Sequence, residues 1–358
     1  MIEGHGGNIR RLAEELGCEP ADITDMSSNV NPMGPPPGLR DYLRENMDLI
    51  NILPDADSGS AVRAFSRRYD LNPGQVLAGN GSTQFIYFLP LALASRHVLI
   101  VGPTYADYAD ACAMHGIAHD FLFAEPEREF QPDVQQIADA AAEVDTVFLC
   151  NPDNPTGALI SRPVLRELCE SLPQTRFIID ESYLPFVKEE TDHSMMHCGL
   201  SNVIMLSSMS KIFRIPGLRI GFLIAPPDII RKMNRYALPW SVNTLALHAV
   251  VWLMEHQEIA DRFVAESRDF LEAERKNFFY AMKGVSSVRL FPSCTSFVLA
   301  ELKGAYNSGE ICAALAREKI LIRNCANFRG LSDRFIRISL KTSAINRMLA
   351  EKLRSVSQ

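Results

Sequence analysis

Residues 207–221 read SSMSKIFRIPGLRIG, and this stretch decides how the surrounding chain folds. It follows the run Val203–Leu206 and leads into a second run, Ile220–Ala225. Both runs are apolar throughout, as are strands buried on both faces of a parallel sheet. A lysine that follows serines usually lies on a solvated surface. Lys211 instead lies between a buried strand and a Gly-Leu-Arg-x-Gly turn, which favours a sheltered cleft at the end of a sheet.

The same alternation of apolar runs and amphipathic segments extends over residues 50–240. We expect further strands at His97–Val101, Thr146–Cys150 and Phe177–Asp180. Helices are expected at Ser58–Tyr69, Ser82–Ala94, Ala106–His115, Pro132–Glu143 and Arg162–Ser171. This order predicts an α/β domain with a mostly parallel sheet, which binds ligands at the carboxyl ends of its strands.

The last third of the chain has a different pattern. A long helical stretch from about Asn243 to Lys283 is followed by strands at Phe297–Glu301, Ile320–Arg323 and Phe335–Leu340 and by helices at Ser308–Glu318 and Ser343–Arg354. This mixture predicts a smaller α+β domain. We therefore divide the chain into an N-terminal segment (1–48) that completes the small domain and forms a lid, a large domain (49–245) and a small C-terminal domain (246–358).

Composition and charge exclude several classes of function. A chain of 358 residues with 47% apolar residues can bury the cores of about two domains. Its net charge of −7 disfavours a nucleic-acid surface, which needs a concentrated basic face. The eight cysteines include no C-x-x-C pair, the N-terminus lacks the apolar core of a signal peptide, and no apolar stretch is long enough to span a bilayer. We expect a cytoplasmic protein with reduced thiols that binds neither nucleic acid nor membrane.

Two motifs suit the ring of an electron-accepting cofactor. Asp180 ends an apolar run, and although such an acid is common in α/β enzymes, it can also hold a pyridine nitrogen protonated. Tyr183, three residues on, can reach the phenolic oxygen of such a ring. Asn154, in the turn NPDNPTG of residues 151–157, can donate to the same oxygen, although a purely structural Asx turn has the same sequence.

Two more motifs suit a phosphate and an aldehyde. Residues 77–84, LAGNGSTQ, place glycines and hydroxyl residues at the start of a predicted helix, where backbone N–H groups can bind phosphate. A lone glycine loop is weak evidence by itself. The hydroxyls and the arginine near Lys211 suit the same phosphate, and a sheltered lysine amine can form a Schiff base with an aldehyde.

In this order, the four motifs resemble those of the fold-type-I pyridoxal-phosphate enzymes, in the branch of histidinol-phosphate aminotransferase. The resemblance covers essentially the whole chain. It implies an aspartate-aminotransferase-like fold, pyridoxal 5′-phosphate bound to Lys211, and a homodimer with its active site between two domains and near the subunit interface. It also implies that Tyr105 stacks on the cofactor ring. The other implied cofactor contacts are Gly81, Ser82, Thr83, Asn154, Asp180, Tyr183, Ser208, Ser210 and Arg219.

Four separate stretches resemble the threonine-phosphate decarboxylases of cobalamin biosynthesis: residues 5–10, 27–35, 239–243 and 322–331. This resemblance implies that His5, Asn29, Arg323 and Arg337 surround the substrate's phosphate and carboxylate. A site for a substrate with two anionic groups needs cationic or hydrogen-bond-donating residues at two places, and the guanidinium of an arginine can bind either a phosphate or a carboxylate. The expected activity is that of a carboxy-lyase, which converts L-threonine O-3-phosphate to (R)-1-aminopropan-2-yl phosphate, or L-serine phosphate to ethanolamine phosphate, with Lys211 returning the proton.

Departures from the family pattern leave alternatives open. Leu53 stands where the family usually has a tyrosine that reaches the neighbouring subunit's cofactor phosphate. The segment Ser82-Thr83-Gln84 lacks the acidic residue that the family commonly has there, and Ser296 replaces an asparagine that is frequent at its position. A histidinol-phosphate-type aminotransferase that uses 2-oxoglutarate explains the cofactor residues equally well. A cofactor-sensing regulator would need a DNA-binding domain that we do not expect here. The histidine pairs 115/119 and 193/197 are typical of surface residues, so we expect no metal.

Overall fold

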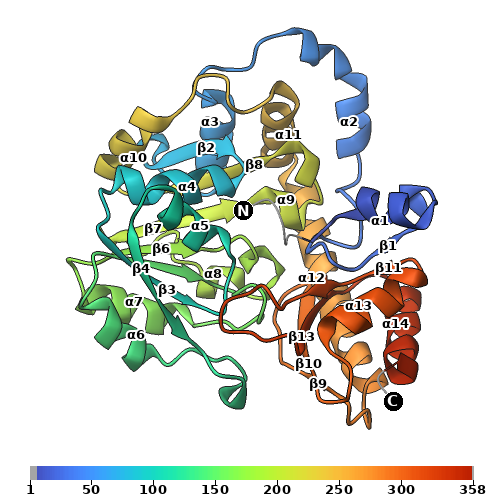
Figure 1. The fold of residues 1–358 in the computed structure, drawn as a ribbon. Coiled ribbons are helices and arrows are strands. Elements are labelled where there is room, and N and C mark those ends of the chain that lie inside the picture. Colours follow the sequence, from blue (N-terminus) through green and yellow to red (C-terminus); the bar gives the residue numbers. More distant parts are fainter. Residues whose placement is uncertain (1–5, 357–358) are drawn as a thin grey trace.

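A computed structural model describes residues 6–356, and its largest element is a seven-stranded sheet (Figure 1). The strand order is β2-β8-β7-β6-β5-β3-β4. Only β8 runs antiparallel to its neighbours, β2 and β7. The predicted α/β architecture with a mostly parallel sheet is therefore confirmed. The strands are β2 Val76–Asn80, β3 His97–Gly102, β4 Ala118–Phe123, β5 Thr146–Cys150, β6 Arg176–Asp180, β7 Val203–Ser208 and β8 Ile220–Ile224.

Helices cover both faces of this sheet because its strands are apolar on both faces. Along β3, Val98 and Ile100 pack under one layer of helices, while Leu99 and Val101 pack under the other. This alternation follows the two-residue period of a strand. The first layer contains α4 (Ser82–Ala92), α5 (Asp107–Met114) and α10 (Pro227–Met233), and the second contains α6 (Val134–Ala141) and α7 (Arg162–Ser171).

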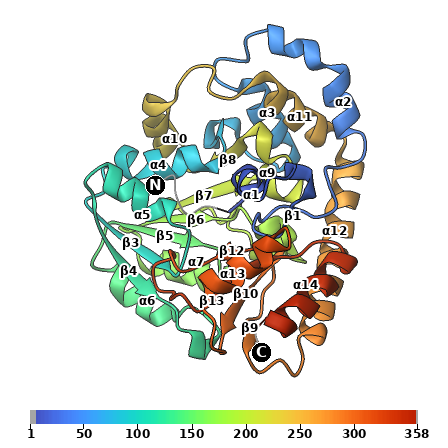
Figure 2. The same ribbon diagram turned by 45° about the vertical axis from the view of Figure 1, so that its right-hand side comes forward.

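The smaller part of the molecule contains a four-stranded antiparallel sheet of order β12-β13-β10-β9 (Figure 2). The two-residue strands β1 and β11 pair in parallel, so the N-terminal segment joins this part of the molecule. The three-part division of the chain stays a prediction. The elements are α1 Ile9–Leu16, β1 Thr24–Asp25, α2 Leu39–Glu45, β9 Val288–Leu290, β10 Phe297–Leu302, α13 Ser308–Arg317, β11 Ile320–Leu321, β12 Arg323–Asn324, β13 Phe335–Ser339 and α14 Ser343–Val356.

The long helical stretch expected after Asn243 is two helices rather than one. Its first part, α11, spans Thr244–Glu255, and its second part, α12, spans Gln257–Ala281. Between them His256 has φ −99° and ψ 54°, outside the helical region, and its ring stacks on Trp252 with the ring centroids 4.4 Å apart. The remaining helices are α3 Gly59–Arg68, α8 Glu190–His193 and α9 Met209–Ile212, with short 3-10 turns at Pro20–Asp22, Met47–Asn51, Pro73–Gln75, Pro126–Arg128, Leu184–Phe186, Pro216–Leu218 and Asn234–Tyr236.

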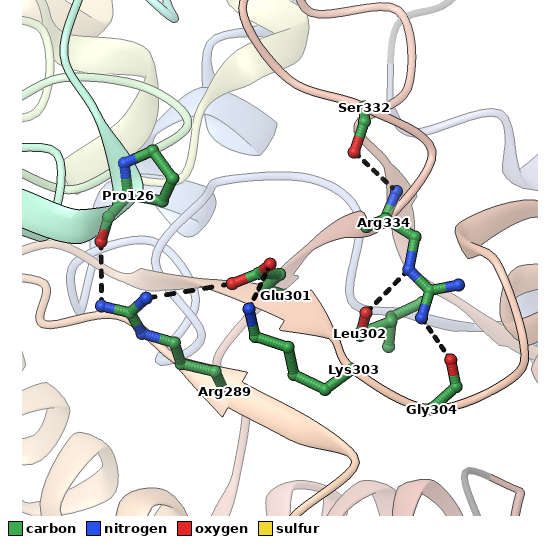
Figure 3. A network of polar contacts seen from close by, with 8 residues as sticks. All are labelled: Pro126, Arg289, Glu301, Leu302, Lys303, Gly304, Ser332 and Arg334. Carbon is green, nitrogen blue, oxygen red and sulfur yellow. Dashed lines mark hydrogen bonds and ion pairs between the residues drawn. The ribbon is translucent and has the colours of Figure 1, made fainter.

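Polar and aromatic contacts connect the small sheet, at β9, to the segment that follows β4 of the large sheet. Arg289 donates to the carbonyl of Pro126 at 2.8 Å and lies 4.0 Å from Glu301, which also pairs with Lys303 (Figure 3). Nearby, Phe130 of the large part packs edge-on against Phe291, with the ring centroids 4.9 Å apart. This contact helps to fix how the small sheet faces the large one. Arg334 closes the neighbouring loop by donating to the carbonyls of Leu302 and Gly304 (Figure 3).

Within residues 6–356, no helix combines the length and the apolar composition needed to cross a membrane.

Candidate active site

Each sequence motif with a proposed chemical role follows the carboxyl end of a strand in the large sheet. Asp180 ends β6, and Lys211 lies in α9, directly after β7. Tyr105 follows β3, and Gly81 follows β2. Because these strands run in the same direction, their carboxyl ends meet at one edge of the sheet, where parallel α/β proteins bind ligands.

A cavity of about 580 Å³ lies at this edge, walled on its other side by the N-terminal segment and the small sheet. Seven of the residues predicted to form the site line it: Asn29, Tyr105, Asn154, Tyr183, Lys211, Arg323 and Arg337. His5, which was also predicted to contact the substrate, lies outside the described residues. The structure thus brings these seven candidates together around one space, whereas the predicted cofactor contacts Gly81, Ser82, Thr83, Asp180, Ser208, Ser210 and Arg219 do not line it.

Lys211 has the environment of a reactive amine. Burial lowers the pKa of its ammonium group to about 8, and the positive charges of Arg219 and Arg337 act in the same direction. The backbone carbonyl of Lys211 accepts hydrogen bonds from the N–H groups of Asn31 and Arg214, at 3.0 and 3.3 Å. A substantial neutral fraction near neutral pH makes this amine a nucleophile and a proton carrier.

Asp180 is held by two hydrogen bonds beneath the cavity. The hydroxyl of Tyr108 donates to its Oδ2, and the backbone N–H of Ser182 donates to its Oδ1, both at 2.9 Å. Burial raises the pKa of Asp180, while the donors and the charge of Lys211 oppose the rise. A cation opposite this carboxyl group would favour its ionised form. Tyr108 was not predicted; it lies in the first turn of α5, and its ring packs edge-on against that of Tyr105, with the ring centroids 5.9 Å apart.

The amide of Asn154 is oriented by its neighbours. Its Oδ1 accepts from Nη1 of Arg337 and from Nδ2 of Asn29, the latter at 3.5 Å. Asn29 Nδ2 also donates to the Tyr183 hydroxyl at 3.3 Å, and Ser339 fixes the Asn29 amide by donating to its Oδ1 at 2.6 Å. Asn154 Nδ2 and the Tyr183 proton are therefore left to donate elsewhere. Burial raises the pKa of Tyr183 to about 12, so this hydroxyl keeps its proton.

Glycines bring backbone and arginine close together at the start of α4. Gly81 has φ 74°, and a Cβ at this position would lie 2.6 Å from Nη2 of Arg219. A Cβ on Gly221 would lie 2.3 Å from the backbone nitrogen of Ser82, and Gly221 is the register partner of Ser208. We call Gly81, Ser82, Ser208 and Arg219 the phosphate cup, because a helix N-terminus beside a guanidinium suits that anion.

The two other residues predicted near this cup differ in their surroundings. Thr83 lies in the first turn of α4 beside Ser82. Ser210 is buried, and its hydroxyl donates to the carbonyl of Ile220 at 3.2 Å, which fastens α9 to β8.

Two arginines face each other directly in the small sheet. Arg323 on β12 is the register partner of Arg337 on β13, an arrangement of like charges that is unfavourable without an anion nearby. Burial lowers the pKa of Arg323 to about 10 and also lowers that of Arg337. Within the described chain, the buried Nε of Arg337 has no hydrogen-bond partner. This pair is equipped to bind an anionic group of a ligand.

The cavity contains cations that the sequence analysis did not single out. Arg214 lines it, whereas the only acidic residue in the described lining is Asp25, which accepts from the N–H groups of Ser27 and Ser28 and from the Ser27 hydroxyl. Lys341 is buried nearby, with its pKa lowered to about 8 by burial, and donates to the carbonyl of Ser28 at 3.4 Å. The cavity is therefore strongly electropositive. Lys341 belongs to no sequence motif, and its contact is with Ser28, 313 positions earlier in the chain.

Residues 6–356 contain no group of three or more His, Cys, Asp or Glu side chains placed to hold a metal ion. His115 contacts the carbonyl of Tyr87, and His119 lies edge-on to Phe121. All eight cysteines are present as free thiols.

Comparisons with known proteins agree with this geometry. Residues 21–353 match the family Aminotransferase class I and II. The threonine-phosphate decarboxylase of Salmonella typhimurium is 34% identical over 98% of this chain and 96% of its own length. The crystal structure of L-threonine-O-3-phosphate decarboxylase from Porphyromonas gingivalis is 30% identical, with a TM-score of 0.83 over 93% of this chain and 99% of its own.

Two further solved structures share this fold. Histidinol-phosphate aminotransferase from Clostridium acetobutylicum is 26% identical, with a TM-score of 0.85 over 94% of this chain and 99% of its own. An aspartate aminotransferase from Thermus thermophilus has a TM-score of 0.85 at 18% identity, over 99% of this chain and 97% of its own, so the fold is aspartate-aminotransferase-like, as expected. The chain belongs to the class I and II aminotransferase family of pyridoxal 5′-phosphate enzymes.

Proposed function

We propose that this enzyme decarboxylates a phosphorylated amino acid, L-threonine O-3-phosphate or L-serine phosphate, in cobalamin biosynthesis. The observation that carries the proposal is the facing pair of Arg323 and Arg337 in the wall of an electropositive cavity that also contains Lys211. A substrate with both a phosphate and a carboxylate satisfies two cationic poles. The relative from Salmonella typhimurium, 34% identical over nearly its whole length, is named threonine-phosphate decarboxylase and supports the same assignment.

The residues present fit pyridoxal 5′-phosphate. The phosphate cup has no space for side chains at Gly81 and Gly221, as a close approach of backbone to a phosphate requires. Asp180, fixed by Tyr108 and Ser182, would face the ring nitrogen. The ring's phenolic oxygen would accept from Asn154 Nδ2 and the Tyr183 hydroxyl, Tyr105 would cover the ring, and Lys211 would hold the aldehyde carbon. When bound, this cofactor withdraws electrons from the substrate's α-carbon.

The protein's own residues then determine which bond at that carbon is broken. Which bond breaks depends on how the substrate's two anions are held, because these contacts orient the bonds at the α-carbon. Arg323 and Arg337 help to bind these anions, and the hydrogen bond that Arg337 donates to Asn154 links substrate orientation to the residues proposed to hold the cofactor ring. Lys211, with a pKa of about 8, holds a proton that it can return to the α-carbon after carbon dioxide has left.

We also propose that the enzyme is a homodimer. Large apolar side chains are exposed on two adjacent segments, Ile50–Leu53 and Leu238–Trp240, with Leu53 74% exposed and Trp240 53% exposed. The Trp240 N–H donates to the carbonyl of Ala56, three residues after Leu53, at 3.2 Å, and the Thr244 hydroxyl donates to the carbonyl of Ile52 at 3.0 Å. Apolar surface of this kind is typical of an interface between subunits. A monomeric mass in light scattering at micromolar concentration would contradict this proposal.

A second candidate function is transamination of the histidinol-phosphate type. The structural similarity to the Clostridium acetobutylicum aminotransferase, with a TM-score of 0.85, favours it. Both reactions require the same cofactor contacts, and the arginine pair would bind the phosphate of either substrate.

One experiment separates the two reactions. The purified enzyme is incubated with each phospho-amino acid, with and without 2-oxoglutarate, and carbon dioxide and aminoalkyl phosphate are measured. We expect both products without any acceptor. Turnover that strictly requires 2-oxoglutarate would reject decarboxylation, and histidinol phosphate serves as the control amino donor.

A further inference from the structure

Arg214 has an unusual backbone conformation in the wall of the cavity. It lies three residues after Lys211, just beyond α9, and is one of the cavity's four cationic lining residues. Its φ is 47°, in the left-handed region that favours glycine and is uncommon for a long side chain. Strained residues of this kind concentrate at functional sites, where the surrounding structure holds them in place.

The guanidinium of Arg214 uses only part of its donor capacity within the protein. Its Nη1 donates to the carbonyls of Asn31 and Pro32, at 3.2 and 2.8 Å. In the described chain, neither Nε nor Nη2 of Arg214 has a protein acceptor, and no carboxylate forms an ion pair with it. Arginine has five N–H donors in a rigid fork, so the remaining edge can bind an anion.

The other three cationic residues that line the cavity make different contacts or have a different assigned role. Arg337 is buried and contacts Asn154, next to the place proposed for the cofactor ring. Arg323 donates to the carbonyl of Asn324 and to Asn327, and lies over the ring of Phe328. Lys211 is assigned to the cofactor. Arg214 is exposed and therefore lies where the far end of a bound substrate would meet solvent.

We propose that Arg214 is a specificity-determining residue that binds the phosphate group of the substrate. This inference rests on the proposed function, because it concerns the anion that distinguishes a phospho-amino acid from an ordinary one. A dianionic phosphate matches a partly exposed guanidinium, and such charge-assisted hydrogen bonds are among the strongest that a protein side chain makes.

The backbone conformation supplies a sharp test. The variant Arg214→Gly removes the guanidinium and its two hydrogen bonds to the carbonyls of Asn31 and Pro32, but glycine adopts φ 47° without strain, which offsets that loss of stability. Arg214→Lys keeps a positive charge but loses the fork. The matched control is Lys319→Gly, which has the same kind of backbone at φ 61° and lies on the surface, outside the cavity lining.

Binding is measured by calorimetry on the cofactor-loaded proteins, with 3-phosphoglycerate as an unreactive analogue and glycerate as the analogue without phosphate. We expect Arg214→Gly to weaken 3-phosphoglycerate binding about tenfold, the effect of losing a charged hydrogen bond, with glycerate binding and Tm unchanged. Arg214→Lys should recover part of the loss, and Lys319→Gly should bind like the wild type. In turnover, KM for the phospho-amino acid should rise while kcat changes little.

Two results would overturn the inference. One is unchanged 3-phosphoglycerate affinity in Arg214→Gly, and the other is an equal loss for both analogues, which would indicate a general distortion of the cavity. The proposed reaction can also fail while this inference holds. That is the case if the wild-type enzyme binds 3-phosphoglycerate more tightly than glycerate, and loses this preference in Arg214→Gly, but releases no carbon dioxide from either phospho-amino acid.

Discussion

The two sides of the cavity are built in different ways. On the cofactor side, Asp180 and Lys211 follow the carboxyl ends of central, buried strands, and Gly81 follows the edge strand β2 of the same sheet. On the substrate side, the contacts join residues far apart in the chain: Ser339 holds Asn29, and Arg337 holds the carbonyl of Ser27, each across 310 positions. The cofactor side is therefore fixed by one rigid sheet, whereas the substrate side is assembled from several segments. Changes on the cofactor side should abolish function, and changes on the substrate side should adjust it.

Replacing Lys211 should have the largest effect. Lys211→Ala removes the amine that attaches the cofactor and carries the proton, so we expect loss of the visible absorbance of bound pyridoxal phosphate and a fall in turnover of at least about 10³-fold. The matched control is Lys341→Ala, which removes another buried lysine whose pKa is also lowered to about 8. Retention of the visible band in Lys211→Ala, or its loss in the control, would refute the assignment.

Asp180→Asn should have the next largest effect, because it removes the negative charge proposed to face the ring nitrogen while preserving size. We expect turnover to fall about 10²- to 10³-fold, in line with losses of comparable electrostatic stabilisation. Tyr108→Phe, which removes one hydrogen bond to the same carboxylate, should lower turnover only a few-fold. Similar effects from the two variants would contradict the role given to the charge.

The lowered pKa of Lys211 predicts how cofactor loading depends on pH. Only the neutral amine attacks the aldehyde, and its fraction rises as pH increases through about 8. The rate at which cofactor-free protein acquires visible absorbance should therefore increase about tenfold from pH 7 to a plateau above pH 9. A midpoint near the ordinary lysine value would show that burial and the neighbouring arginines do not act on this amine.

Ser339→Ala, on the substrate side, should have the smallest effect. It frees the amide of Asn29, whose orientation is linked to Asn154 and Tyr183, at a cost of about 1 kcal/mol. We expect a several-fold change in kcat/KM and a small shift in the pH midpoint of the visible band, with Tm nearly constant. Ser343→Ala, which removes a hydroxyl bonded to Glu274 outside the cavity, is the control. Equal spectral behaviour in the two variants would mean that Ser339 is only structural.

The difference between the two sides also explains what the sequence could predict. Strands such as Thr146–Cys150 contain a run of apolar residues (Val147–Cys150), so their ends, and with them Asp180, Asn154 and Lys211, could be located from local pattern alone. β2 was missed because Gly79 and Asn80 interrupt its apolar run, and its pairing with β8 supplies what local propensity lacks. The break at His256 was missed because both flanking helices are strongly helical in composition.

The substrate side could be predicted only in part. Arg323, Arg337 and Asn29 were named through family resemblance, and all three line the cavity. Their mutual contacts, and the positions of Arg214 and Lys341, depend on tertiary packing: Arg214 contacts Asn31 and Pro32, and Lys341 contacts Ser28. Tyr108 was missed because a buried tyrosine on a helix gives no sign that its hydroxyl reaches a carboxylate on a neighbouring strand.

The central claim is tested most directly by turnover in deuterium oxide, followed by proton NMR. With L-threonine O-3-phosphate or L-serine phosphate and no keto acid, the account predicts an amine product that has lost its carboxylate and carries one deuterium at the former α-carbon. Recovery of substrate deuterated at the α-carbon with its carboxylate intact, or formation of a keto acid, would contradict it.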